Sequence, residues 1–190
     1  MRKEKKLSVK KQFNEAILYL KESKKYIYCS ILIFLIGILF GIIFKDNLSF
    51  LDSKLKELIL KSVSLNPLER IFFILQNNLQ ISIFSIIVGI FFGIFVMLIC
   101  FYNGIILGYV VSKYTSSLTD LWRLIPHGIF ELPAVFISFG LGIKLGFSLI
   151  SKNKTFKENL YSSANTLLLV IIPLLIIAAI IEGLLIFFVS

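Results

Sequence analysis

The longest uncharged stretch of this chain limits its fold more than any other feature. Residues 71–112 contain no Lys, Arg, Asp or Glu, and a single helix of that length would measure roughly 63 Å, about twice the hydrocarbon thickness of a bilayer. The stretch must therefore turn back or break within the membrane. A second uncharged run, residues 26–44, has the length of one spanning helix. Since 57% of the 190 residues are hydrophobic, the sequence predicts a multi-pass protein embedded in the lipid bilayer.

Basic residues flank the apolar runs and predict the orientation of the chain. Residues 1–25 hold nine Lys and Arg against three Glu, and such a flank before the first span usually stays in the cytoplasm. Segment 151–160 has three Lys against one Glu and is expected on the same side. We therefore predict a cytoplasmic N-terminus in the cell membrane. Nucleic-acid binding would need a folded basic face with interleaved aromatics, so we expect no nucleic-acid partner despite the net charge of +9.

The chain divides into two parts by composition. Residues 1–25 are a basic cytoplasmic segment, and residues 26–190 are expected to form a single transmembrane domain. Within that domain, leucine and isoleucine recur at helical spacing over residues 48–62 with charged residues between them, which predicts an amphipathic extracytoplasmic helix. Asn66 followed by Pro67 then has the pattern of a helix start, with Asn66 as the N-cap.

The fold class that follows is an all-α, polytopic transmembrane helix bundle. We expect about five membrane segments, with broken or re-entrant helices around residues 100–133. Residues 79–101 have the length of one span, residues 102–104 (Tyr-Asn-Gly) are expected to interrupt it, and Pro126 and Pro133 divide the segment that follows. Five crossings would place the two chain ends on opposite sides of the membrane, and four crossings are the alternative.

Glycine recurs at an interval of four residues in four of the predicted segments. Such G-x-x-x-G pairs let helix backbones approach closely in lipid, where apolar burial does not drive helix association. Four pairs favour a compact bundle, and they leave open whether the contacts form within one chain or between the protomers of a homo-oligomer. The candidate packing residues are Gly37, Gly41, Gly89, Gly93, Gly104, Gly108, Gly142 and Gly146.

The stretch 126–134, Pro-His-Gly-Ile-Phe-Glu-Leu-Pro-Ala, places ionisable side chains among apolar ones. His127 and Glu131 are four positions apart, so a helix that begins at Pro126 puts them on one face. Ionisable groups inside a membrane are costly unless they are paired, and they mark a candidate functional site. The residues expected to complete this intramembrane polar cluster are Arg123, Asn78, Asn103 and Glu182.

Three interpretations of the intramembrane polar cluster compete. The first is structural, with paired side chains that fix the register of the helices. The second is a proton- or ion-handling site in a transporter or channel, with His127, Glu131 and Glu182 as carriers. The third, a catalytic metal site, is disfavoured because zinc usually needs three or four ligands, whereas the chain has one His, and Cys29 and Cys100 lie within apolar runs. We therefore expect no metal, cofactor or catalytic residue.

Five short motifs together resemble the stage II sporulation protein M family. They are NNL at 77–79, NGIILG at 103–108, PHGIFELPA at 126–134, GLGIKLG at 140–146 and AAIIEG at 178–183. The resemblance covers roughly residues 25–188, and the Pro-His-Gly-x-x-Glu-x-Pro-Ala string is its most specific part. The resemblance implies that the polar positions characteristic of the family are, in this chain, Asn78, Asn103, His127, Glu131 and Glu182.

The resemblance implies a role outside enzymology. The family's namesake is a multi-pass membrane protein that anchors or organises two peptidoglycan-degrading partners during engulfment. We therefore predict a non-enzymatic integral membrane protein that scaffolds or organises other membrane or cell-envelope proteins during membrane remodelling. The alternative is a small transporter or channel that uses His127 and Glu131.

Overall fold

The computed structural model describes residues 8–114, 118–149 and 155–189, and these residues are almost entirely helical. A short 3-10 helix, η1 (Lys45–Leu48), precedes α3, and a π-helical turn, η2 (Leu167–Ile171), joins α7 to α8. The α-helices, in chain order, are α1 (Val9–Glu22), α2 (Lys24–Ile43), α3 (Leu51–Ser64), α4 (Pro67–Gly89), α5 (Gly93–Tyr114), α6 (Leu118–Ser148), α7 (Phe156–Thr166) and α8 (Ile172–Val189).

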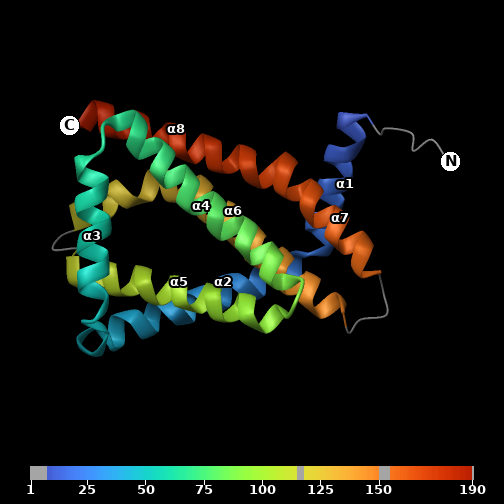
Figure 1. Cartoon of the computed structure of the whole chain (residues 1–190), viewed down its shortest axis with the longest axis horizontal. Helices are drawn as coiled ribbons and strands as arrows, with labels where there is room; N and C mark the ends of the chain where they lie inside the picture. Colours follow the sequence, from blue (N-terminus) through green and yellow to red (C-terminus); the bar gives the residue numbers. More distant parts are fainter. Residues whose placement is uncertain (1–7, 115–117, 150–154, 190) are drawn as a thin grey trace.

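Among the described residues, five helical segments are long and apolar enough to cross a membrane. Four of these spans lie in α2, α4, α5 and α6, and the fifth runs from α7 through η2 into α8. In Figure 1 the spans extend between the two ends of the molecule, whereas α3 lies across one end and α1 across the other. The prediction of an all-α polytopic bundle with about five membrane segments is therefore confirmed.

The long uncharged run turns at a different place from the one expected. α4 ends at Gly89 and α5 begins at Gly93, so the turn occupies residues 90–92, inside the stretch that the sequence suggested as one span. The N–H of Phe92 donates to the carbonyl of Val88 at 3.2 Å. Backbone groups at the turn are thus paired within the chain, as a turn between two spans in an apolar setting requires.

The break expected at residues 102–104 is absent, because α5 continues through them. Asn103 and Gly104, which suggested a break, instead make contacts within and between helices. The Asn103 amide donates to the carbonyl of Ile99 at 2.8 Å on its own helix, and Gly104 lies against the backbone of α2. Both contacts support a continuous helix.

The second half of the expected broken region is also one helix. α6 continues through Pro126 and Pro133, and its first part runs at an angle to the remainder in Figure 1, as proline within a helix commonly causes. The broken or re-entrant helices expected at residues 100–133 are therefore corrected to two continuous helices, the first ending at Tyr114 and the second beginning at Leu118.

Glycines set how closely α2 packs on α5. A Cβ atom built on Gly37 would lie 3.1 Å from the Cα of Gly104, and one built on Gly41 would lie 2.9 Å from the amide nitrogen of Tyr109. Gly108 meets the backbone of α2 in the same way. The contacts advance in the same direction along both helices, so α2 and α5 run parallel.

The same arrangement joins α4 to α6. A Cβ atom on Gly89 would lie 2.7 Å from the Cα of Gly142, and one on Gly142 would lie 3.0 Å from the carbonyl carbon of Ser85. Farther along α6, Gly146 meets Gly93, the first residue of α5, directly after the turn that follows α4. Because the residue numbers rise together on both sides of these contacts, α4 and α6 are also parallel. All eight glycines of the predicted G-x-x-x-G pairs meet another helix of the same chain.

Polar contacts between α2 and α6 run in the opposite order. The Ser30 hydroxyl, in the middle of α2, donates to the carbonyl of Phe136 at 3.0 Å. Ser23, just before α2, contacts Lys144 near the end of α6. α2 and α6 are therefore antiparallel, which agrees with first and fourth spans that cross in opposite directions.

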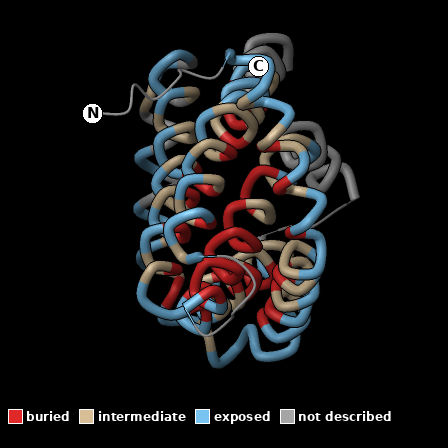
Figure 2. The backbone as a smooth tube through the Cα atoms, turned by 90° about the vertical axis from the view of Figure 1, so that its right-hand side faces the viewer, coloured by how far each residue is buried: buried red, intermediate tan, exposed pale blue. Residues whose placement is uncertain are grey.

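α6 is the most buried of the five spans and lies at the centre of the bundle. Figure 2 shows the buried backbone in the interior and the exposed backbone around it. Large apolar side chains such as Leu32, Phe72 and Ile94 remain exposed on the outer faces of α2, α4 and α5, where a bilayer would cover them. The fully buried apolar residues of α6 are Ala134, Phe139, Leu141, Ile143 and Leu145.

The amphipathic helix predicted at residues 48–62 corresponds to η1 and α3. Asp52, in the first turn of α3, accepts hydrogen bonds from the Tyr109 hydroxyl and the Lys113 ammonium at the end of α5. The predicted N-cap at Asn66 is confirmed, since its side chain accepts from the backbone N–H of Glu69 at 2.9 Å. The first turn of α3 is thus attached to α5, and the helix that follows, α4, begins at a capped residue.

Gly104→Leu should destabilise the bundle, because a side chain there meets the backbone of α2 and cannot be relieved by a rotamer change. We expect a loss of about 1–3 kcal/mol in the free energy of unfolding, measured by denaturation of the detergent-solubilised protein. Leu98→Phe, an enlargement at an exposed position of the same helix, is the matched control and should be close to neutral. Equal losses in the two variants would contradict the assigned packing.

Candidate functional site

A polar pair joins α4 to α6 inside the spanning region. The Asn78 side chain hydrogen-bonds to the carboxyl group of Glu131. Asn78 is only 7% exposed, and Glu131 is half-buried two residues into the candidate span 129–148. The structure therefore brings together two of the residues that the sequence marked, one from each helix of the α4–α6 pair.

Of the remaining residues of the predicted polar cluster, Asn103 has a described side chain, and it does not join this pair. Asn103 donates to Ile99 of its own helix instead. The side chains of Arg123, His127 and Glu182 lie outside the described residues, although α6 and α8 include their positions. The pairing of His127 with Glu131 thus stays a prediction.

The Asn78–Glu131 pair has limited chemistry. A carboxyl group in a medium of low dielectric constant is costly to ionise, and an amide N–H donor offsets part of that cost. Such a pair can fix helix register or hold a proton. No group of three or more His, Cys, Asp or Glu suited to a metal ion occurs among the described residues.

Small polar side chains elsewhere in the spans bond mostly to backbone carbonyls. The hydroxyls of Ser85 and Ser138 donate to carbonyls four residues earlier on their own helices, and the Cys100 thiol donates to the carbonyl of Ser30. The hydroxyl of Ser82 is buried without a hydrogen-bond partner in the described part of the chain. Ser82 follows Asn78 by one helical turn, so both lie on the same face of α4.

A second polar cluster, missed by the sequence analysis, surrounds Lys144 near the other end of α6. The residue is only 9% exposed. Its ammonium group lies 2.9 Å from the Ser23 hydroxyl, 3.6 Å from the centre of the Tyr19 ring and 3.8 Å from the Glu22 carboxylate. α1 and its C-cap therefore supply a hydrogen bond, a cation–π contact and a counter-charge to a buried cation.

Tyr19 continues this cluster into α7. Its hydroxyl lies 3.2 Å from the side-chain oxygen of Asn159 and 3.2 Å from the Ser163 hydroxyl, and burial raises the pKa of Tyr19 to about 12. The Tyr19–Lys144 cluster, made of Tyr19, Ser23, Glu22, Lys144, Asn159 and Ser163, thus ties α1 to both α6 and α7. Sequence reasoning had no signal for it, because its members come from three distant segments without shared spacing.

A double-mutant cycle on Asn78 and Glu131 should show energetic coupling. We expect Asn78→Ala and Glu131→Ala to lower the free energy of unfolding, with an interaction energy of about 0.6–1.7 kcal/mol, the range found for hydrogen bonds between membrane helices. The measurement is denaturation in detergent micelles. Asn103→Ala serves as the control and should not couple to Glu131→Ala; additive effects of Asn78→Ala and Glu131→Ala would count against the pair.

The raised pKa of Tyr19 predicts a loss of stability at high pH. The folded state binds the phenolic proton of Tyr19 more tightly than the unfolded state does. The contribution of Tyr19 to the free energy of unfolding is therefore complete below pH 10 and is lost as the pH rises toward 12. The difference between this pKa and the ordinary tyrosine value of 10.0 corresponds to about 2–3 kcal/mol. Tyr19→Phe should flatten the decline in unfolding temperature over this pH range, whereas Tyr28→Phe at an exposed position should leave it unchanged.

Comparison with known proteins identifies relatives over most of the chain. The model of a family described as "Stage II sporulation protein M" matches residues 30–185. An uncharacterized protein of Methanocaldococcus jannaschii, MJ0706, is 34% identical over 115 residues, which are 57% of this chain and 51% of the relative. A second uncharacterized protein of that organism, MJ0793, is 28% identical over 165 residues, 82% of this chain and 90% of the relative. The chain thus matches about half the length of the first relative and most of the second, and no solved structure matches.

Proposed function

The chain belongs to the stage II sporulation protein M family, and from this premise we propose that it is a non-enzymatic membrane scaffold. In this role it organises partner proteins that remodel the membrane or the cell envelope. The observation that carries the proposal is the contact of helix backbones at the glycines of α2 with α5 and of α4 with α6. Such contacts favour a fixed frame, since closely packed helix pairs have little freedom to slide.

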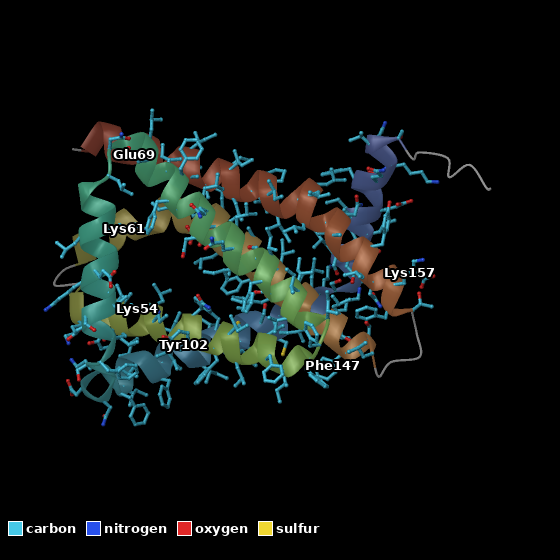
Figure 3. The ribbon with its side chains drawn as sticks, viewed as in Figure 1. Lys54, Lys61, Glu69, Tyr102, Phe147 and Lys157 are labelled. Atoms are coloured by element: carbon cyan, nitrogen blue, oxygen red, sulfur yellow. The ribbon has the colours of Figure 1, made fainter. Side chains whose placement is uncertain are left out.

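The frame displays different elements at its two ends. At one end α3 presents exposed Lys54, Lys56 and Leu60, while Asp52 holds its start to α5. At the other end lie α1 and the beginning of α7, with Lys157 (Figure 3). Because the basic segments around α1 and Lys157 share one end, we propose that this end is cytoplasmic, that α3 is extracytoplasmic, and that the protein resides in the cell membrane.

Partner proteins are proposed to bind at α3 rather than at the glycine faces. The eight glycines already contact helices of the same chain, so a homo-oligomer would also need a different surface. The exposed face of α3 carries Lys54, Lys56, Lys61 and Leu60 beside one acidic side chain, Glu57. This combination suits a protein partner whose surface is acidic and apolar.

The proposal predicts a complex in cells that depends on α3. Lys54→Glu combined with Lys56→Glu should shift the tagged protein from a larger cross-linked complex to its own size, without lowering the unfolding temperature of the purified protein. Lys157→Glu, at the opposite end, is the matched control and should leave the complex intact. A wild-type protein that migrates alone under cross-linking would contradict the scaffold.

A transporter or channel is the second candidate, and the Asn78–Glu131 pair favours it. An ionisable carboxyl group between two spans is a common element of proton and ion pathways. In this case vesicles that contain only the purified protein should carry a proton or sodium flux that Glu131→Gln or His127→Ala abolishes. The scaffold predicts no flux above that of protein-free vesicles.

A further inference from the structure

α1 buries one face against the bundle and leaves an apolar stripe beside that face uncovered. Ala16 and Tyr19 are buried, and the Asn165 amide of α7 donates to the backbone carbonyl of Gln12 at 2.8 Å. These contacts fix the rotation of α1 about its own axis. Val9 and Phe13, one helical turn apart, are nevertheless 71% and 45% exposed.

The apolar stripe continues along the helix. At 100° per residue, Ile17 and Leu20 fall on the same side as Val9 and Phe13, and both are half-buried. Leu18, in contrast, is exposed about 140° around the helix from Phe13. α1 therefore exposes apolar side chains on two different sides, Val9 and Phe13 on one and Leu18 on the other, which allows the side that faces a partner to be identified.

Exposed cations border the apolar stripe. Lys10 and Lys21 are eleven positions apart, which is three helical turns, and so lie along the same edge of the stripe. The opposite side of α1 has a mixed charge, because Lys11 lies there together with Glu15 and Glu22. An apolar stripe bordered by lysines is the pattern of a helix that lies in the interface of an anionic membrane.

The position of α1 places a bilayer beside this stripe. The first span begins at Lys24, directly after Ser23, the C-cap of α1. α1 also runs across the direction of the spans at one end of the molecule in Figure 1, where the lipid headgroups would lie. We propose that α1 docks on the membrane surface, with Val9 and Phe13 among the upper acyl chains and Lys10 and Lys21 bound to the headgroups of anionic phospholipids.

Through the docked helix α1, the lipid composition affects the stability of the contact between α1 and α6. α1 holds the buried Lys144 through Tyr19 and Ser23, so anionic lipids that bind α1 also stabilise this contact with α6. Each lysine near an anionic leaflet contributes on the order of a fivefold preference in binding. α1 docks in this way whether the protein scaffolds partners or moves ions.

Tryptophan quenching tests the docking in the full-length protein. Trp122 is the sole tryptophan, so Phe13→Trp and Leu18→Trp are each placed in a Trp122→Phe background, with Val9→Trp as a second reporter on the stripe. The proteins are reconstituted in phosphatidylcholine vesicles with acyl chains brominated near the headgroup, with and without phosphatidylglycerol. Phe13→Trp and Val9→Trp should be quenched more than Leu18→Trp, and the quenching should increase with phosphatidylglycerol.

Lysine variants separate charge from apolar insertion. Lys10→Gln combined with Lys21→Gln should remove the increase caused by phosphatidylglycerol, whereas Lys11→Gln, on the opposite side, should retain it. Equal quenching of the Phe13→Trp and Leu18→Trp variants would overturn the proposal. It would also be overturned if both stripe reporters remained unquenched while α1 cross-linked to a second copy of the chain.

Discussion

The close approach of helix backbones at glycine is the contact on which the rest of the structure depends. In a bilayer, lipid is as apolar as the helix surfaces, so association relies on packing and hydrogen bonds. Gly37 with Gly104 and Gly89 with Gly142 bring two pairs of spans into backbone contact. α6, the central helix, contacts both pairs, through Gly142 with α4 and through the Phe136 carbonyl with Ser30 of α2.

Polar groups hold α6 near both ends of its membrane-spanning part. Glu131 meets Asn78 of α4, and Lys144 meets Ser23 and Tyr19 across the start of α2. Between them the helix is lined with fully buried apolar side chains. Directional contacts at these two separated points add to the glycine packing in determining the position of α6 along the bundle axis.

Several features of the fold could be predicted because they are local. The number of spans follows from the lengths of the uncharged runs. The N-cap at Asn66 follows from the residues next to it, and the positions where helices pack closely follow from the spacing of the glycines. The turn at residues 90–92 could not, since Ile-Phe-Phe carries no turn residues, while Tyr-Asn-Gly at 102–104 does. The burial of Lys144 depends on α1 folding back over the end of the bundle, which no local pattern encodes. In the candidate site, the sequence named Asn78 as one of several polar residues expected to join Glu131, and the register of α4 against α6 places these two side chains together.

The order of the glycine contacts along the chain has a consequence for biogenesis. α2 pairs with α5, and α4 pairs with α6, so the two pairings interleave rather than follow one another. No cut between residues 41 and 142 leaves both pairings within single fragments. During synthesis α2 enters the membrane long before α5 exists, and α4 likewise awaits α6. The α2–α5 contact therefore cannot form until the third span is inserted, nor the α4–α6 contact until the fourth is, so the bundle cannot assemble as a series of consecutive hairpins.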